Sequence, residues 1–109
     1  MMSDVLKGLY DVVIDRKSNP QEGSYTNYLF NEGIDKILKK VGEESAETII
    51  AAKNGSKQAI TEETCDLLYH LLVMLADREI DIEDIFDELE RRRLKIGNLK
   101  VMKKTDKLT

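Results

Sequence analysis

At 109 residues, the chain has room for one domain and little room for two. Its residues are 41% hydrophobic and 35% charged, with six glycines and one proline, which excludes a disordered or loop-rich chain and favours a compact helical domain. The single cysteine excludes an internal disulfide and a cysteine-based zinc site. Any bound metal is therefore expected to have oxygen ligands.

Charge is distributed unevenly along the chain. Residues 1–90 hold nine Lys and Arg against 20 Asp and Glu, whereas residues 91–109 hold eight basic residues and one acid. We therefore divide the chain into a single domain, residues 1–95, and a basic C-terminal tail, residues 96–109. The acidic domain is a poor nucleic-acid surface, and the tail can contact phosphates, an acidic partner or only water.

Neither a membrane span nor a secretion signal is expected. The longest apolar run, from Leu67 to Ala76, has about half of the ~20 residues that a membrane-spanning helix needs. Near the start, Asp4 stands where a signal peptide would carry basic charge, and no long apolar stretch follows. We expect a cytoplasmic location, with neither a membrane nor a nucleic acid as partner.

Helical spacing of apolar residues predicts an all-α fold with four main helices and one short helix. The main helices are expected at residues 4–16, from residue 34 to a left-handed turn at Asn54-Gly55, from Ser56 or Thr61 to residue 78, and at residues 82–93. The short helix follows Ser24, which is its expected N-cap. Asp81 is the expected N-cap of the last helix.

The helix that contains Leu67 to Ala76 is expected to lie at the centre of the fold, because it is apolar around nearly its whole circumference. The other helices are short and amphipathic, and they cover such a helix only thinly. We therefore expect a homodimer, in which a second copy completes the bundle and can contribute basic residues to a functional site.

Five acids stand within or beside apolar stretches: Glu43, Glu44, Glu47, Glu63 and Asp66. At about 100° per residue, Glu44 and Glu47 share one helix face, and Glu63 and Asp66 share a face of the next helix. The short connection at Asn54-Gly55 makes these helices antiparallel neighbours and brings the two acid pairs level. Carboxylates gathered in this way repel one another unless a cation such as Mg²⁺ compensates them.

Simpler explanations exist for the same residues. Lys36 and Lys40 are spaced to form ion pairs on the helix that carries Glu44 and Glu47, and acids at a helix start can stabilise the helix dipole. His70 shares a face with Glu63, and a lone histidine on so apolar a helix is more often a core residue than a ligand. It can still orient a carboxylate of the site.

The acid spacing resembles a known family signature. Glu43-Glu44-x-x-Glu47, fifteen further residues and Glu63-x-x-Asp66 are similar to the metal signature of the all-α nucleoside triphosphate pyrophosphohydrolases. Ser24-Tyr25-Thr26, Lys40-Val41-Gly42-Glu43-Glu44 and Asp66-Leu67-Leu68-Tyr69-His70 resemble phosphoribosyl-ATP pyrophosphohydrolases more narrowly. That resemblance covers most of the chain up to Arg93, and it implies hydrolysis of phosphoribosyl-ATP to phosphoribosyl-AMP and pyrophosphate, the second step of histidine biosynthesis.

The resemblance also implies roles for individual residues. The Mg²⁺ ligands it implies are Glu44, Glu47, Glu63 and Asp66, while Glu43 or Glu47 activates the attacking water. Substrate-binding candidates are Ser24, Tyr25, Thr26, Lys36, Lys40, Arg16 and Arg91, and His70 is a supporting residue. Two other functions stay open: a pyrophosphatase that removes unwanted nucleotides such as dCTP or dUTP, which needs the same acids, and a helical interaction module without enzymatic activity.

Overall fold

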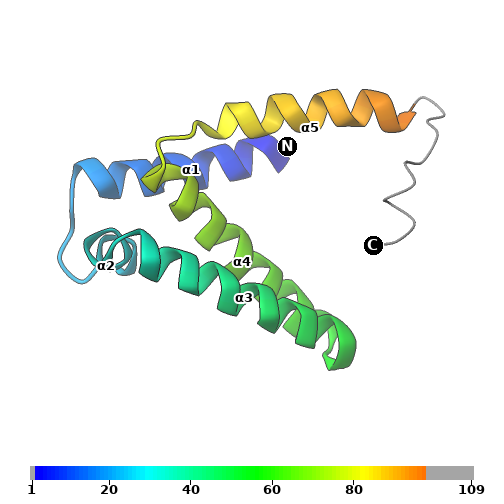
Figure 1. The fold of residues 1–109 in the computed structure, drawn as a ribbon, viewed down its shortest axis with the longest axis horizontal. Helices are drawn as coiled ribbons and strands as arrows, with labels where there is room; N and C mark the ends of the chain where they lie inside the picture. Colours follow the sequence, from blue (N-terminus) through cyan, green and yellow to red (C-terminus); the bar gives the residue numbers. More distant parts are fainter. Residues whose placement is uncertain (1, 98–109) are drawn as a thin grey trace.

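The computed structural model describes residues 2–97 (Figure 1). These residues form five helices: α1 (Met2–Ser18), α2 (Tyr25–Glu32), α3 (Ile34–Asn54), α4 (Lys57–Asp77) and α5 (Ile82–Gly97). No strand occurs within this range, so the all-α prediction is confirmed. Residues 98–109, most of the predicted basic tail, lie outside the described part of the chain.

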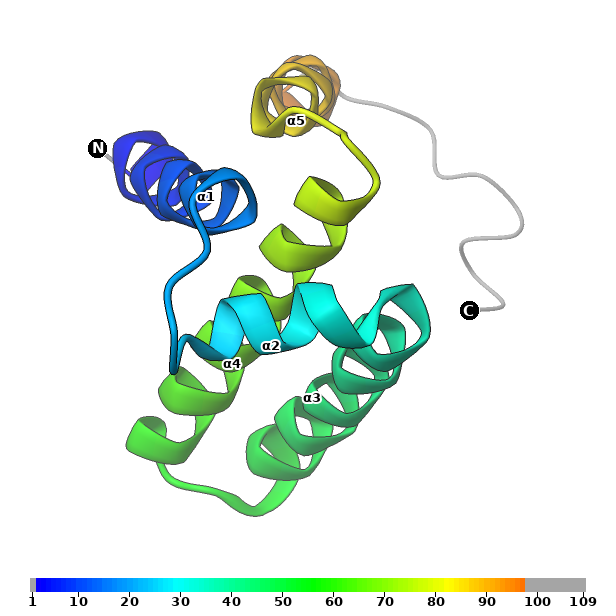
Figure 2. The same ribbon diagram turned by 90° about the vertical axis from the view of Figure 1, so that its left-hand side faces the viewer.

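Helices α3 and α4 form an antiparallel hairpin, which is the longest feature of the fold (Figures 1 and 2). Each helix has 21 residues and is therefore about 31 Å long at a rise of 1.5 Å per residue. Helix α2 packs against both members of the hairpin, and α1 lies across α4. Helix α5 runs beside α1, on the side of the molecule away from α3.

The predicted caps at Ser24 and Asp81 are confirmed. The Ser24 hydroxyl accepts the N–H of Asn27 at 3.2 Å, and the Asp81 carboxylate accepts the N–H of Glu83 at 3.0 Å. Helix α4 begins after Ser56, whose hydroxyl accepts the N–H of Ala59. Each side chain satisfies a backbone donor that the helix itself leaves without a partner.

The left-handed turn predicted at Asn54-Gly55 is wrong, because Gly55 has an extended backbone with φ −94° and ψ 176°. The site needs glycine for a different reason. A Cβ atom at Gly55 would lie 2.7 Å from the carbonyl oxygen of Ala51 and 3.2 Å from the Cβ of Ala59. The close approach of the two helix ends, rather than a positive φ, therefore selects glycine in this turn.

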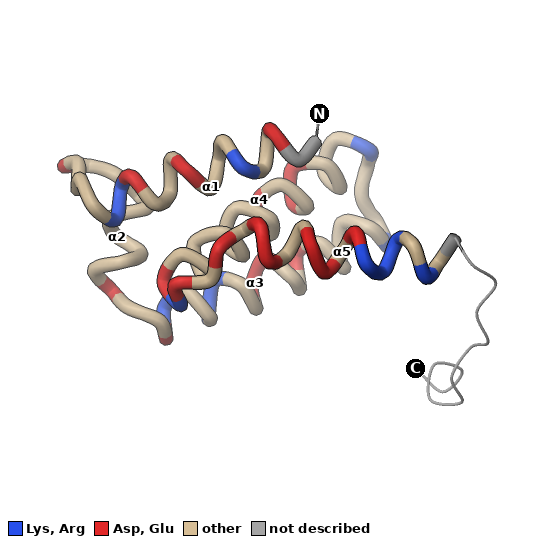
Figure 3. The backbone as a smooth tube through the Cα atoms, turned by 90° about the horizontal axis from the view of Figure 1, so that it is seen from above, with Lys and Arg blue, Asp and Glu red and all other residues tan. Residues whose placement is uncertain are grey.

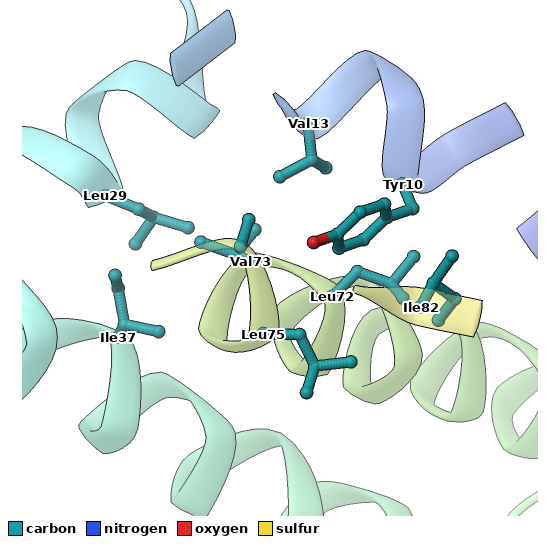
Figure 4. Close-up of a cluster of buried hydrophobic side chains, with 9 residues drawn as sticks. Tyr10, Val13, Leu29, Ile37, Leu72, Val73, Leu75 and Ile82 are labelled. Carbon is teal, nitrogen blue, oxygen red and sulfur yellow. The ribbon is translucent and has the colours of Figure 1, made fainter. Parts of the chain in front are cut away.

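Helix α4 supplies more of the hydrophobic core than any other helix, as its apolar circumference predicts (Figure 4). Leu72, Val73, Leu75 and Ala76 are buried against apolar residues from the four other helices: Tyr10, Val13, Leu29, Ile37 and Ile82. Burial of each large side chain stabilises the fold by roughly 1.5–3 kcal/mol. The core therefore fixes α4 relative to α3 and to the chain that precedes α3.

Two polar contacts attach α1 to the end of α4. The Tyr10 hydroxyl donates to the carbonyl oxygen of Ile80 at 2.6 Å, and the Lys17 ammonium donates to that of Ala76 at 2.9 Å. The lysine also places positive charge at the C-terminal end of α4, where the helix dipole favours it. Among the described helices, none is long and apolar enough to cross a membrane.

Candidate metal and phosphate site

Carboxylates from α3 and α4 meet on the inner side of the hairpin. Glu44 on α3 and Glu63 and Asp66 on α4 each offer an oxygen atom, and these atoms lie within 4.8 Å of one another. Glu44 is buried, Glu63 is half-buried and Asp66 is exposed, so the cluster opens to solvent on one side. The antiparallel register predicted from the short turn thus brings acids from both helices together.

Two oxygen atoms of this cluster are buried without a hydrogen-bond partner: Oε2 of Glu44 and Oε2 of Glu63. Burial raises the pKa of Glu44, and the neighbouring Glu47 carboxyl raises it further, while Lys40 and His70 act in the opposite direction. A buried carboxylate oxygen with no partner is unfavourable. A divalent cation would provide the missing partner, and a donor set made only of carboxylate oxygens suits a hard ion.

The other two predicted acids lie at the edge of the cluster. Glu47 is exposed and close enough to Glu44 to raise its pKa, but it is not one of the three residues whose oxygens converge. Glu43 is also exposed and forms an ion pair with Lys40 at 3.4 Å. Both carboxylates are therefore accessible to a water molecule or a ligand beside the cluster.

Two lysines on α3 differ in their partners. The Lys40 ammonium lies 3.4 Å from Glu43 and 3.5 Å from Glu44. Although burial lowers the pKa of Lys40, Tyr25 and the two carboxylates outweigh that effect and raise it. The Lys36 ammonium instead lies over the Tyr28 ring, 5.7 Å from its centroid. Lys40 is thus paired with carboxylates of the acid cluster, whereas Lys36 places positive charge on α3 beside Tyr28.

His70 connects the acid-bearing helix to α2. Its Nδ1 lies 2.7 Å from the carbonyl oxygen of Asp66, which can only accept, so Nδ1 carries the proton. In the neutral ring, Nε2 then accepts the Tyr25 hydroxyl at 3.0 Å. Since His70 is buried, it fixes the position of the Tyr25 side chain, which is 46% exposed.

The hydroxyl residues at the start of α2 are mostly engaged. Ser24 serves as the helix cap, and the Thr26 hydroxyl is hydrogen-bonded to the hydroxyl of Tyr69 on α4. Tyr69 was not predicted, because only the fold brings it to Thr26. Tyr25 remains the residue of this segment with an exposed aromatic ring next to Lys40 and Glu44.

Arg16 and Arg91 are not drawn into the cluster. Arg16 pairs with its neighbour Asp15 at 3.0 Å. Arg91 lies on α5, where its Nε donates to the Glu88 carboxylate at 3.1 Å. Hydrogen bonds from Arg91 and Arg92 lower the pKa of Glu88 to about 2. Helix α5 lies on the side of the molecule away from α3 (Figure 1), so the fold does not bring Arg91 to the acid cluster of the same chain.

Known proteins similar to this chain match the part of it that carries the acid cluster. A sequence profile described as "Phosphoribosyl-ATP pyrophosphohydrolase" matches residues 6–93, which include every acid of the cluster. The chain is 56% identical over 97 residues to a protein of Clostridium novyi named "Phosphoribosyl-ATP pyrophosphatase", covering 89% of this chain and 88% of the relative. A Streptococcus thermophilus protein of the same name is 54% identical over 95 residues, covering 87% of this chain and 91% of that protein.

A third relative contains the same unit within a longer protein. "Histidine biosynthesis bifunctional protein HisIE" of Caldanaerobacter subterraneus is 58% identical over 89 residues. The match covers 82% of this chain and 43% of that relative. The matched unit therefore occurs both in chains of similar length and as less than half of a bifunctional protein.

Proposed function

Because the chain belongs to the phosphoribosyl-ATP pyrophosphohydrolase family, we propose that it performs this family's reaction with Mg²⁺ bound between α3 and α4. The chain is a hydrolase that converts phosphoribosyl-ATP to phosphoribosyl-AMP and pyrophosphate, in histidine biosynthesis. The observation that supports the metal site most directly is the pair of buried oxygens without partners on Glu44 and Glu63. We place the reaction in the cytoplasm, where nucleoside triphosphates are available.

The ligands in this proposal are Glu44, Glu63 and Asp66, with Glu47 as a fourth at the edge of the cluster. Mg²⁺ held by these residues would supply positive charge that offsets the negative charge developing as the bond between the α and β phosphates breaks. Glu44 contributes most to the affinity in our account, because it is the most buried carboxylate of the set.

The remaining acids can move the proton of the attacking water. Glu47 is exposed beside Glu44, so its carboxylate can accept that proton at the edge of the cluster. Glu43 is a second candidate, although its carboxylate is already engaged in an ion pair with Lys40 at 3.4 Å. Substitution of Glu47 or of Glu43 by glutamine, one at a time, distinguishes which of the two carboxylates accepts the proton.

Residues from α2 and α3 form the substrate side of the site. Lys40 lies next to the carboxylates and can neutralise the triphosphate, and Lys36 extends this basic surface. The hydrogen bond from the Tyr25 hydroxyl to His70 holds the exposed Tyr25 ring near the ammonium groups of Lys40 and Lys36. Ser24 and Thr26 act mainly by fixing α2, while Arg16 and Arg91 remain candidates for the outer phosphates.

Pyrophosphate release from phosphoribosyl-ATP, compared with release from ordinary NTPs and dNTPs, tests the proposed function. We expect a strong preference for phosphoribosyl-ATP that is lost when EDTA is added. A preference for dCTP or dUTP would instead indicate nucleotide-pool cleaning. No hydrolysis of any triphosphate, together with absent Mg²⁺ binding, would favour the helical interaction module.

A homodimer is part of this proposal. Helices α1, α4 and α5 line an apolar groove of about 270 Å³ that includes Leu68, Leu71, Ile85, Phe86 and Leu89. Leu89 is 56% exposed and Leu94 is 62% exposed in the single chain. Burial of such a surface against a second copy would remove apolar area from water.

The charges on α5 indicate how two copies can pair. Acids occupy the first part of this helix and basic residues the last part (Figure 3). Two α5 helices packed antiparallel therefore bring the acidic half of each against the basic half of the other. This arrangement is self-complementary, as a twofold interface requires.

A further inference from the structure

Lys36 differs from Lys40, one turn later on α3, in having no carboxylate partner. Within residues 2–97, no Asp or Glu oxygen forms an ion pair with its ammonium, which contacts the face of Tyr28 instead. The side chain is half-buried on α3, so its position is restricted. An unneutralised ammonium held against an aromatic ring is well suited to bind an anion.

The position of Lys36 relative to the acids is set by α3. Lys36 and Glu44 are eight residues apart on this helix, which separates them by about 12 Å along its axis. Two rings connect these ends: the Lys36 ammonium lies over the Tyr28 ring, and Tyr25 is close enough to Glu44 for this carboxylate to raise the pKa of its hydroxyl. The Tyr25 and Tyr28 rings are stacked with centroids 6.0 Å apart, and each ring is nearly half exposed.

These residues form a row of three kinds of group along α2 and α3. Acids stand at one end, two aromatic rings in the middle and an unpaired ammonium at the other end. Phosphoribosyl-ATP has a matching order of groups: a triphosphate, an adenosine, and a second ribose that ends in a 5′-phosphate. This distal phosphate carries nearly two negative charges at neutral pH, and ordinary ATP lacks it.

We propose that Lys36, positioned by the Tyr28 ring, binds the distal phosphate of phosphoribosyl-ATP and so distinguishes this substrate from ATP. The inference rests on the proposed function, because it takes the triphosphate to lie at the acid cluster. Lys40 cannot serve the distal phosphate, since it lies within 3.5 Å of Glu44 at the other end of the row. Lys36 thus acts in specificity and Lys40 in binding the reacting end.

Equilibrium binding of two ligands that differ only in the distal phosphate tests this role. Affinities of the Mg²⁺-loaded protein for phosphoribosyl-AMP and for ribosyl-AMP, its dephosphorylated form, are measured by calorimetry. We expect Lys36→Met to weaken phosphoribosyl-AMP binding about tenfold and to leave ribosyl-AMP binding unchanged. Lys36→Arg should retain most of the difference between the ligands, because it keeps the charge.

Controls separate this role from a general effect of the substitution. Lys39→Met removes an exposed lysine three residues along the same helix and should change neither affinity. Tyr28→Leu should reduce the advantage of phosphoribosyl-AMP, whereas Tyr28→Phe, which keeps the ring, should retain it. An equal loss of affinity for both ligands in Lys36→Met, or no loss for either, would overturn the inference.

The proposed function is checked separately on the unmodified protein. If the wild-type chain fails to hydrolyse phosphoribosyl-ATP, the proposed function is wrong, and the role of Lys36 falls with it. If the wild-type chain hydrolyses phosphoribosyl-ATP but Lys36→Met loses no selectivity for the distal phosphate, only the role assigned to Lys36 is wrong.

Discussion

The Thr48 hydroxyl on α3 lies 3.2 Å from the carbonyl oxygen of Glu63 on α4. The same hydroxyl is 2.7 Å from the carbonyl oxygen of Glu44, one turn earlier on its own helix. One side chain therefore joins the backbones of two acids from opposite sides of the hairpin. This contact fixes the relative height of Glu44 and Glu63, on which their convergence depends.

Replacement of Thr48 by valine tests this contact. Valine keeps the shape of the side chain but loses the hydroxyl, so we expect a loss of about 1 kcal/mol in the free energy of unfolding. We also expect Mg²⁺ affinity to fall about tenfold, because residues that hold the ligands in place affect affinity on this scale. Calorimetric titration with Mg²⁺ measures the second effect, and Thr48→Ser should retain most of the affinity. Unchanged Mg²⁺ affinity in Thr48→Val would contradict the positioning role.

Glu44→Gln should stabilise the metal-free protein. The substitution removes a buried charge whose pKa burial has raised, and it relieves the repulsion from Glu47. Thermal unfolding in EDTA should therefore show a higher Tm for the variant than for the wild type. Glu62→Gln is a matched control, since Glu62 is exposed on α4 and its carboxylate accepts a hydrogen bond from the Gln58 amide at 3.1 Å, away from the acid cluster. A lower Tm for Glu44→Gln would show that this carboxylate is stabilising even without metal.

Stability without metal should depend on pH through Glu44. Its pKa in the folded protein is raised above the ordinary value of 4.5, so the folded state binds the proton more tightly than the unfolded state. The free energy of unfolding in EDTA should therefore fall as the pH rises from about 4.5 through the raised pKa. Saturating Mg²⁺ should reverse this fall, because the cation binds the ionised carboxylate.

Urea unfolding of the wild type and of Glu44→Gln over this pH range isolates the contribution of one group. The difference between the two proteins should shrink toward acid pH, where Glu44 is protonated in both folded and unfolded states. A difference that stays constant with pH would show that the Glu44 pKa is not raised.

Two glycines should respond oppositely to alanine. A Cβ atom at Gly55 would lie 2.7 Å from the Ala51 carbonyl oxygen, so Gly55→Ala should destabilise the fold by about 1–3 kcal/mol. Gly8 lies within α1 with no atom within 4 Å of the added Cβ, so Gly8→Ala should stabilise it by about 0.5–1 kcal/mol. Chemical denaturation of both variants measures these effects. Equal tolerance of the two substitutions would mean that the turn at Gly55 can open without cost.

The oligomeric state should depend on Leu89. This side chain lines the apolar groove and is 56% exposed in the single chain, so Leu89→Asp should cost the monomer little. Sedimentation analysis should show a wild-type dimer, a monomer for Leu89→Asp, and a dimer for the conservative Leu89→Met. A wild-type monomer at high protein concentration would contradict the dimer.

Local rules were enough to predict the helices. Apolar spacing, the caps at Ser24 and Asp81 and the break near Gly55 all act within a few residues along the chain, so the sequence alone indicates them. The helical repeat also placed Glu44 on the side facing α4. The conformation of Gly55 was predicted wrongly, because the approach of Ala51 and Ala59 in the folded hairpin, not local preference, determines it.

Contacts between distant residues could not be predicted in the same way. Thr48 and Glu63 are fifteen residues apart, and Thr26 and Tyr69 are 43 apart, so neither pair forms a pattern along the chain. The cation–π contact of Lys36 with Tyr28 likewise depends on how α2 packs against α3. The meeting of acids from α3 and α4 was predictable from their spacing, whereas the residues that hold these acids in place emerge only from the packing of the helices.

The most direct test of the central claim is the rate of pyrophosphate release from phosphoribosyl-ATP as Mg²⁺ is added to the metal-free protein. We predict that the wild type and Glu62→Gln reach full activity over the same Mg²⁺ range. Glu44→Gln and Asp66→Asn should remain nearly inactive at every Mg²⁺ concentration, although circular dichroism should show both variants to be folded. Full activity of either variant, or wild-type activity that persists in EDTA, would contradict the assignment of the α3–α4 carboxylates as the metal site of this enzyme.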